Sequence, residues 1–273
     1  MRVPFDGSWR LAEAPTLRLV EDAKDRLKAS VKRLDKLQRR LHAEDKHAVL
    51  LVFQAMDAAG KDSTIRAILR GVNPAGCQVF SFKRPSSEEL DHDFLWRTSR
   101  RLPERGRIGV FNRSYYEELL VVKLNPGILA AQRLPSTPST IWADREHSIR
   151  EHEAHLARNG TRILKFFLNV SPEEQRRRLL SRIDDPDKNW KFEGGDLAVR
   201  ARWGEYMAAY EQAINATSRE HAPWFCIPAD DKPSMRAIVA DRVVSALEDL
   251  DPQYPAVSEE QHAQLAEWRK ELS

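Results

Sequence analysis

Two kinds of hydrophobic segment follow one another along this chain. Five short runs are almost continuously apolar, at residues 47–53, 77–82, 108–111, 162–170 and 224–227. Runs without alternation are typical of parallel strands that are covered on both faces. Between them, apolar residues recur every three or four positions, which predicts helices at about 63–71, 88–102, 114–123 with 139–158, and 172–219. This β-α-β-α order predicts an α/β fold of three layers (α/β/α), with a parallel five-stranded sheet and right-handed crossovers.

Helices are also predicted at both ends of the chain. Residues 17–45 place leucines on one stripe and eight lysines and arginines on the other faces, which favours a packed helix with a solvated basic face over a surface that gathers a polyanion. Two further helices are expected at 235–249 and 258–270. We therefore expect one domain over 1–273, with an N-terminal helical extension at 1–46 and a C-terminal tail helix within 251–273.

Two connections are longer than the fold needs. Residues 125–140 are rich in proline and small residues, which predicts an irregular loop. Within 172–219, the spacing of Ser171 and Glu174 is that of a capping box, and Asp196 can cap a second helix after a Gly-Gly corner. A helix–loop–helix between strands of a phosphate-binding sheet has the layout of a lid, so we expect an inserted helical lid at 172–219.

The first apolar run leads into a turn of small residues and then into a predicted helix. Backbone N–H groups at such a turn can bind a phosphate, and Gly60-Lys61 stands where a phosphate-binding loop carries its lysine. The pattern G-x-x-x-x-G-K-[ST] is matched only in part, because Ala55 and Asp62 replace its first glycine and its hydroxyl residue. An ordinary strand–turn–helix corner is the alternative, but Asp57 favours function, since a carboxylate there can help to hold Mg²⁺ against phosphates.

Other polar residues follow the remaining strands, where an open parallel sheet has its ligand crevice. Lys83 and Arg84 follow the second run, and Asn112 to Glu118 follow the third. Arg182, Lys188 and Lys191 lie in the predicted lid, from which they can swing onto phosphates. Any one of these groups can be structural, but together they indicate a phosphoryl-transfer site.

Composition narrows the alternatives. The net charge of +3 over 273 residues does not indicate a nucleic-acid partner, although residues 97–113 carry six arginines against one glutamate beside the candidate site. Cys77 and Cys226 lie in apolar runs, which predicts buried thiols in a reduced compartment. No apolar stretch is long enough to span a membrane and no signal pattern begins the chain. We expect a cytoplasmic protein with neither a membrane nor a nucleic-acid partner.

Four strings together resemble the polyphosphate kinase 2 family: Ala55 to Asp62 (AMDAAGKD), Ser81 to Pro85 (SFKRP), Phe111 to Glu118 (FNRSYYEE) and Asp185 to Lys191 (DPDKNWK). They occur in the family's order, and the resemblance covers roughly residues 15–250. It implies a P-loop kinase-like fold with a helical lid. It also implies Mg²⁺, with Mn²⁺ as an alternative, and reversible transfer of the terminal phosphoryl of inorganic polyphosphate to ADP and AMP, giving ATP.

The resemblance assigns expected roles to matching residues. Asp57 resembles the metal-linked acid, Lys61 the P-loop lysine, Arg113 the arginine of the second, Walker-B-like motif, and Arg182 and Asp196 the arginine and acid of the lid. The expected catalytic residues are Asp57, Lys61, Asp62, Asn112, Arg113, Glu117 and Arg182. The expected phosphate- and nucleotide-binding residues are Ala58, Ala59, Gly60, Lys61, Ser63, Thr64, Lys83, Arg84, Lys188, Lys191 and Asp196; the expected metal ligands are Asp57 and Glu117.

One departure from the family pattern bears on the acceptor. Many members carry Asp-Arg-Ser in the second motif, but this chain has Asn112-Arg113-Ser114, so we expect Glu117 to supply the missing charge. This form resembles the class III branch, which implies that both AMP and ADP are acceptors. An ATP-dependent nucleoside or nucleotide kinase is the alternative, and a non-enzymatic polyanion-binding protein is a remote one. We also expect a homo-oligomer, either a dimer or a tetramer.

Overall fold

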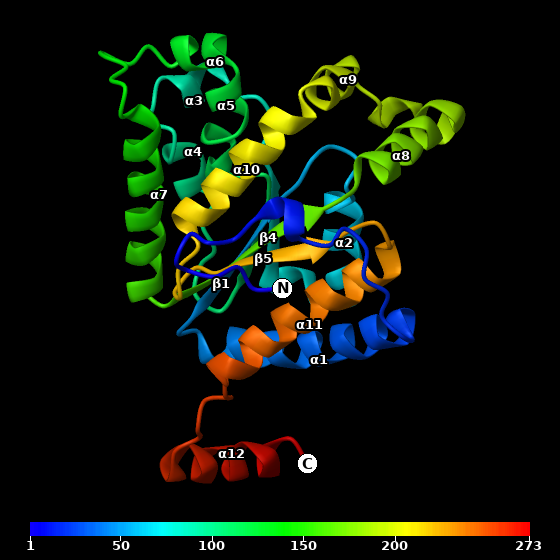
Figure 1. Cartoon of the computed structure of the whole chain (residues 1–273). Coiled ribbons are helices and arrows are strands. Elements are labelled where there is room, and N and C mark those ends of the chain that lie inside the picture. The colour runs from blue at the N-terminus through cyan, green and yellow to red at the C-terminus, as the bar shows by residue number, and fades with distance from the viewer.

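Five parallel strands form one sheet in the order β2-β3-β1-β4-β5 (Figure 1). The computed structural model describes all of residues 1–273. The strands are β1 (Ala48–Gln54), β2 (Cys77–Ser81), β3 (Ile108–Asn112), β4 (Thr161–Asn169) and β5 (Trp224–Pro228). The predicted α/β fold with a parallel five-stranded sheet is therefore confirmed.

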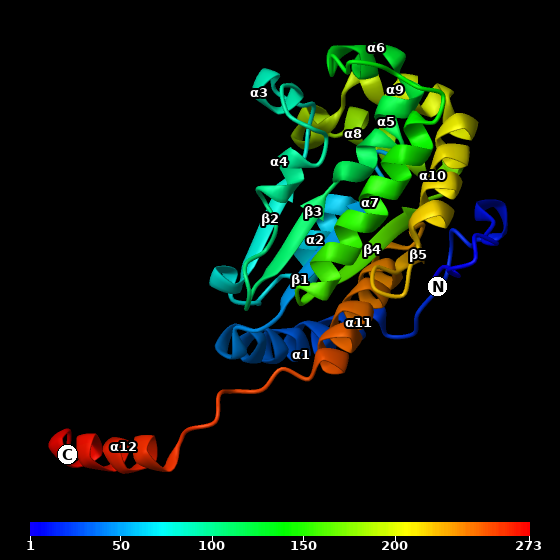
Figure 2. The same ribbon diagram turned by 90° about the vertical axis from the view of Figure 1, so that its left-hand side faces the viewer.

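Helices cover both faces of the sheet. On one face, α11 packs against α1, α2, β4 and β5; on the other, α7 packs against β4 and α10 (Figures 1 and 2). The longer helices are α1 (Ala23–Glu44), α2 (Lys61–Ile68), α7 (Ile141–Arg158), α8 (Pro172–Asp184), α9 (Gly194–Ala201), α10 (Trp203–Thr217), α11 (Lys232–Leu250) and α12 (Glu259–Glu271). The short ones are α3 (Ser87–Leu90), α4 (Trp96–Ser99), α5 (Val121–Leu124) and α6 (Pro126–Ala131). The 3₁₀-helices are η1 (Leu11–Glu13), η2 (Pro74–Gly76), η3 (Tyr115–Glu118) and η4 (Pro186–Lys191).

The core lies on both faces of the central strand. Every residue of β1 is buried, and Phe53 stacks on Phe166 of β4 with ring centroids 5.0 Å apart. The edge strand β2 differs from the prediction, because it is only half-buried and Val79 is 47% exposed. Cys77 on this strand is accordingly half-buried, whereas Cys226 in β5 is buried as predicted.

Two predicted helices are shorter than the sequence pattern indicated. The helix expected from residue 17 begins at Ala23, after Asp22 in a left-handed conformation with φ of 47°. Residues before it contact the body instead, and the backbone N–H of Val20 donates to the Ser234 hydroxyl at 2.9 Å. The helix expected over 88–102 is divided into α3 and α4. Between them the Asp93 carboxylate accepts the backbone N–H of Leu95 at 2.9 Å, a local bond that competes with helix formation.

Two further segments were predicted wrongly in detail. The helix expected over 114–123 is a 3₁₀ turn, η3, followed by α5. The loop expected over 125–140 contains α6, which begins at Pro126, where a proline's missing N–H costs nothing.

Residues 172–219 form four helical pieces in place of two. The Ser171 hydroxyl accepts the backbone N–H of Glu174 at 3.1 Å, as predicted, but the capping box is not completed: the backbone N–H of Ser171 donates to Asp230, and the Glu174 side chain pairs with Arg178. This helix continues to Asp184, and η4, α9 and α10 follow. The predicted capping role of Asp196 is wrong: α9 begins at Gly194, so Asp196 lies inside its first turn.

The two ends of the chain behave differently. The first residues form an antiparallel bridge to β5, with the backbone N–H of Val3 donating to the carbonyl of Trp224 at 2.9 Å, so the expected N-terminal extension is only partly helical. Part of the basic face of α1 pairs with α11, as in the 2.6 Å contact between Arg26 and Asp241. At the other end, α12 stands apart from the body and buries none of its residues (Figures 1 and 2). No helix of this chain has the length and apolar character needed to cross a membrane.

Both thiols should react slowly with iodoacetamide in the folded protein. Burial raises the pKa of Cys77 to about 11 and that of Cys226 to about 12. Because the thiolate is the nucleophile, a rise of about two pKa units lowers the reactive fraction about 100-fold at pH 8. Mass spectrometry of labelled protein should therefore show native rates about 100-fold or more below those in urea. Similar rates in both conditions would contradict this description of the thiols.

Candidate functional site

The ladder between β1 and β3 brings two loops together at one edge of the sheet. Phe53 of β1 is paired with Asn112 of β3, and the backbone N–H of Arg113 donates to the carbonyl of Phe53 at 3.0 Å. The residues that follow each strand therefore lie side by side. Both loops, 55–60 and 113–118, were predicted to be functional.

The first loop has the backbone form of an anion site. Ala58 and Gly60 both have left-handed conformations, with φ of 61° and 109°. A Cβ atom at Gly60 would lie 3.3 Å from the Met235 methyl, so glycine suits this position for two reasons. α2 begins at Lys61, directly after this turn, and its N-terminus adds the favourable end of the helix dipole. The loop therefore combines two features that attract phosphate.

A guanidinium lies between two carboxylates where the loops meet. Arg113 Nη2 lies 2.8 Å from Asp57 Oδ1, and its Nη1 lies 3.7 Å from Glu117 Oε2. Burial alone would lower the pKa of Arg113, but Glu117 and Asp57 outweigh it and raise that pKa above its ordinary value. Burial raises the pKa of Glu117 against the opposing effect of Arg113. With its amide nitrogen directed at Glu117, Gln54 donates to that carboxylate at 3.0 Å.

The lysine of the loop is folded back onto its own backbone. Lys61 Nζ donates to the carbonyl of Ala55 at 2.8 Å and to that of Met56 at 3.4 Å. Burial lowers its pKa, and the nearby Arg113 lowers it further. Lys61 is thus desolvated and held only by carbonyl groups, so a phosphate oxygen would be a stronger partner.

Asp62 and Asn112 contact each other directly. Asn112 Nδ2 donates to Asp62 Oδ1 at 2.6 Å and, at 3.3 Å, to the hydroxyl of Ser81. This bond joins the start of α2 to the end of β3. Asp62 stands where the common loop pattern has a hydroxyl residue, and Asn112 stands where the second motif often has an aspartate. The two departures are therefore hydrogen-bonded to each other.

Asp57 and Glu117 are the residues that can hold a metal ion. They contact two nitrogens of one guanidinium, so a cation is already accommodated between them. No group of three or more acidic, histidine or cysteine side chains forms a closed metal cage. Two carboxylates without a cage suit a hard divalent cation that takes its other ligands from water and phosphate oxygens. The donor set therefore fits the metal expected from the sequence.

The other predicted residues are less directly placed. Ala58 and Ala59 form the loop itself, but the hydroxyls of Ser63 and Thr64 donate to the carbonyl of Gly60 at 3.0 and 2.9 Å, which directs them away from the anion site. Lys83 and Arg84 are exposed beyond β2. Ser63, Thr64, Lys83 and Arg84 therefore stay candidates for phosphate binding, and none of them forms a hydrogen bond or an ion pair with Asp57, Arg113 or Glu117.

The predicted lid residues contact one another rather than the loop. Arg182 Nη1 lies 3.2 Å from Asp196 Oδ2, which joins α8 to α9. Lys188 pairs with Asp185 at 2.5 Å, and Lys191 lies over the Trp190 ring. Burial raises the pKa of Asp196, with a smaller effect from Asp57. In this structure α8 and α9 project beyond the carboxyl ends of the strands (Figure 1).

Arg178 is a residue of this site that the sequence did not identify. Its guanidinium is buried and donates to the carbonyls of Ala59 and Ala229, both at 2.6 Å, and more weakly to that of Ala58. On the preceding turn of α8, Gln175 Nε2 donates to the carbonyl of Asp57 at 3.0 Å. Gln175 and Arg178 therefore bind the carbonyl groups of the phosphate loop. In the sequence, Arg178 is the last of three consecutive arginines, which look alike before the helix phase is known.

Tyr210 of α10 was also missed. It is buried, and burial followed by the charges of Glu117 and Asp57 raises its pKa well above the ordinary value. Its place on the apolar stripe of α10 predicts a core residue. The structure adds that this part of the core adjoins the acidic pair.

Comparisons with known proteins agree on one family. The statistical model described as Polyphosphate kinase 2 (PPK2) matches residues 19–255. The chain is 51% identical over 269 residues to the ADP-polyphosphate phosphotransferase of Rhodopseudomonas palustris, covering 97% of this chain and 93% of that protein. It is 48% identical over 224 residues to the AMP/ADP-polyphosphate phosphotransferase of Meiothermus ruber, covering 82% of this chain and 80% of that protein. Among solved structures, the polyphosphate kinase 2 of Arthrobacter aurescens superposes with a TM-score of 0.87 at 35% identity, covering 97% of this chain and 95% of that one.

Replacing Arg178 by alanine should destabilise the fold and weaken anion binding at the loop. The change leaves the buried carbonyls of Ala59 and Ala229 without their donor, a loss that typically costs roughly 1–3 kcal/mol for each group, while Glu174 keeps Arg177 as a partner. Urea unfolding should report this cost, and calorimetric titration with tripolyphosphate should show at least about tenfold weaker binding, which corresponds to about 1.4 kcal/mol. Arg177→Ala is the matched control: Arg177 is 71% exposed and pairs only with Glu174, so the change should leave the urea midpoint and the tripolyphosphate affinity close to those of the wild type. Equal effects of the two variants would contradict the assigned role of Arg178.

Proposed function

The chain belongs to the polyphosphate kinase 2 family, and from this premise we propose that it transfers the terminal phosphoryl of inorganic polyphosphate to ADP and AMP. The ADP reaction forms ATP and leaves a polyphosphate that is one unit shorter, and it is reversible. The observation that carries the proposal is the cluster of Asp57, Arg113 and Glu117 beside Lys61 in a phosphate loop. Two cations and two carboxylates at a helix N-terminus are what phosphoryl transfer requires.

Two observations support ADP and AMP as acceptors. The relatives at 51% and 48% identity are named ADP-polyphosphate and AMP/ADP-polyphosphate phosphotransferases. The second motif of this chain also has Asn112 where many family members have aspartate, a form that resembles the class III branch. We therefore propose that both AMP and ADP are phosphorylated, with adenine preferred.

The residues of the cluster divide the work of transfer. Lys61 leaves the carbonyls of Ala55 and Met56 for phosphate oxygens, and Arg113 leaves Asp57 to neutralise the charge that develops on the moving phosphoryl. Backbone N–H groups at Gly60 and Lys61 hold the adjacent phosphate. The attacking oxygen belongs to the terminal phosphate of the nucleotide, which is ionised at neutral pH, so no protein base has to remove a proton from it.

A divalent metal completes the site, and we propose Mg²⁺, with Mn²⁺ as the alternative. Asp57 and Glu117 would hold it. When bound, it neutralises phosphate charge and polarises the phosphoryl oxygens. Arg113 lies between these carboxylates in the free protein, so departure of its guanidinium toward phosphate opens the position for the metal.

We propose that 172–219 acts as a lid. The N-terminal part of α8 is fixed to the phosphate loop through Gln175 and Arg178, and α10 is anchored to the body, as where Arg202 donates to the carbonyl of Leu124 at 2.9 Å. Between these anchors, the hydrogen bonds and ion pairs of residues 182–200 stay within the segment itself. Closure would bring Arg182, Lys188 and Lys191 toward the phosphates and exclude water, which otherwise competes as an acceptor.

The exposed helix α12 supports assembly as a dimer or tetramer. A cytoplasmic location stays a prediction.

The alternative functions explain fewer observations. An ATP-dependent kinase of the common P-loop type would place a hydroxyl on the metal, but Asp62 occupies that position and is bonded to Asn112. A non-enzymatic polyanion-binding protein would have no use for Asp57 and Glu117 in an anion site.

Purified protein should form ATP from ADP, Mg²⁺ and long-chain polyphosphate, and should convert AMP to ADP and then to ATP. Lys61→Ala or Arg113→Ala should lower kcat about 10³-fold, because each removes charge that neutralises the transferring phosphoryl. Lys36→Ala on the exposed face of α1 is the control and should keep wild-type turnover. Absence of ATP with either acceptor would refute the function, and activity with ADP alone would refute only the AMP part.

Removal of one proposed metal ligand should change the metal requirement. Glu117→Gln keeps the size of the side chain but removes its charge, so half-maximal activity should need at least about tenfold more Mg²⁺. Excess chelator should abolish the activity of the wild type. The exposed Glu88 provides the control, since Glu88→Gln should leave the Mg²⁺ requirement unchanged. An unchanged requirement in Glu117→Gln would show that Glu117 is not a ligand.

A further inference from the structure

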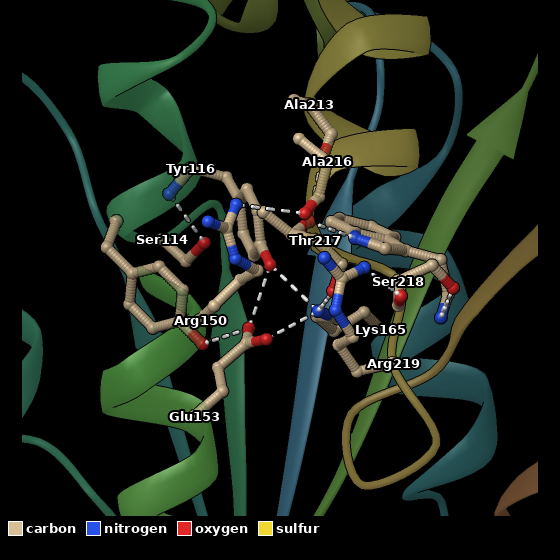
Figure 3. Close-up of polar contacts among 12 residues, drawn as sticks. Ser114, Tyr116, Arg150, Glu153, Lys165, Ala213, Ala216, Thr217, Ser218 and Arg219 are labelled. Atoms are coloured by element: carbon tan, nitrogen blue, oxygen red, sulfur yellow. Dashed lines mark hydrogen bonds and ion pairs between the residues drawn. The ribbon is translucent and has the colours of Figure 1, made fainter. Parts of the chain in front are cut away.

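A lysine and a glutamate form an ion pair in the interior, beneath the second loop. Lys165 of β4 and Glu153 of α7 are both completely buried, and Nζ lies 2.6 Å from Oε2 (Figure 3). Removing two charges from water is costly, and replacing such a pair by apolar residues is often neutral or stabilising. Stability alone is therefore a weak reason for this pair, and its contacts indicate another.

All donors and acceptors of the pair are used. Besides Glu153, Lys165 Nζ donates to the Tyr116 hydroxyl at 2.8 Å and to the carbonyl of Thr217 at 2.9 Å. Glu153 Oε1 accepts the hydroxyls of Tyr115 and Tyr116, both at 2.8 Å. Figure 3 shows Glu153 of α7, Lys165 of β4 and Tyr116 of η3 directed toward one another, next to Thr217 at the end of α10. Burial lowers the pKa of Lys165 to about 8, against the opposing effect of Glu153.

The network joins two elements that line the phosphoryl-transfer site. Tyr115 and Tyr116 begin η3, two and three residues after Arg113 and directly before Glu117. Thr217 is the last residue of α10, the final helix of the segment proposed as a lid, which carries Tyr210 beside the acidic pair. Both elements are thereby tied to one point on β4, next to the central strand.

We propose that Lys165 and Glu153 are positioning residues that fix the turn carrying Arg113 and Glu117, and the end of α10, relative to the phosphate loop. The proposal rests on the function proposed above. Arg113 has a left-handed backbone with φ of 62°, a conformation that costs free energy for a residue other than glycine and has to be held by its surroundings. Its guanidinium has to exchange Asp57 for phosphate while the backbone stays in place, and a displacement of about 1 Å can cost about 100-fold in rate.

The direct test removes both charges and keeps the volume, in the double variant Lys165→Met/Glu153→Leu. Both changes are made together because a single change would leave one buried charge unpaired. We expect a folded protein with a lower melting temperature, because two tyrosine hydroxyls and the carbonyl of Thr217 lose their partners. Its kcat should fall at least about tenfold, because Arg113 and Glu117 are no longer held in place. Tripolyphosphate should bind within about twofold of the wild-type affinity, because the network does not contact the phosphate loop.

Two further variants complete the experiment. Arg33→Met/Glu248→Leu removes an ion pair between α1 and α11, remote from η3, and should leave kcat unchanged. Tyr116→Phe removes only the hydroxyl that joins η3 to both charges, and it decides the question if the double variant does not fold. A lower kcat in Tyr116→Phe at unchanged tripolyphosphate affinity supports the proposal.

The outcomes separate this inference from the function itself. Wild-type kcat in the folded double variant, or in Tyr116→Phe if the double variant does not fold, would overturn the positioning role while the wild type remains an active kinase. A fall in kcat matched by an equal fall in the control pair would also overturn it, because the effect would be one of general stability. A wild type that forms no ATP would overturn the proposed function and this inference with it.

Discussion

Phe53 of β1 and Asn112 of β3 are neighbours in a parallel ladder, and the amide of Arg113 continues that ladder by donating to the carbonyl of Phe53 at 3.0 Å. The two loops that leave these strands have to run side by side. A guanidinium from one therefore reaches a carboxylate from the other, at 2.8 Å from Asp57. If the register slipped by one residue, the side chain of Arg113 would face the other side of the sheet and Asp57 would lose its partner. The charge balance of the site thus depends on backbone pairing.

Two buried cations stabilise this arrangement without belonging to the reacting cluster. Arg178 donates to carbonyls on the far side of the phosphate loop, and Lys165 donates to a carbonyl at the end of α10 and to a tyrosine of η3. Each links segments that are distant in sequence, so each restricts how the loops can move relative to the sheet. Lys61 and Arg113 hold only weak or exchangeable partners in the free protein. Arg178 and Lys165 thus hold the backbone in place, whereas Lys61 and Arg113 remain available for phosphate.

The sequence predicted the sheet and the centre of the site because both follow from local patterns. Continuous apolar runs identify parallel strands, and parallel strands bring their carboxyl ends to one edge, so Asp57, Lys61 and Arg113 could be grouped before any coordinates were known. Details that depend on helix phase were less predictable. Arg176, Arg177 and Arg178 are indistinguishable in the sequence, yet only Arg178 turns inward. The helix α9 starts three residues earlier than a cap at Asp196 would require, which moves Asp196 from the cap into the first turn. The exposure of β2 depends on strand order, which its own residues do not encode.

The central claim is that phosphate and metal replace the contact between Arg113 and Asp57. A crystal structure with Mg²⁺, ADP and a polyphosphate analogue that cannot transfer its terminal group would test this most directly. The account predicts that the guanidinium of Arg113 lies on phosphate oxygens, that Asp57 faces the metal, and that Lys61 has left the carbonyls of Ala55 and Met56. An occupied site in which Arg113 still contacts Asp57 and the metal lies away from both carboxylates would contradict it.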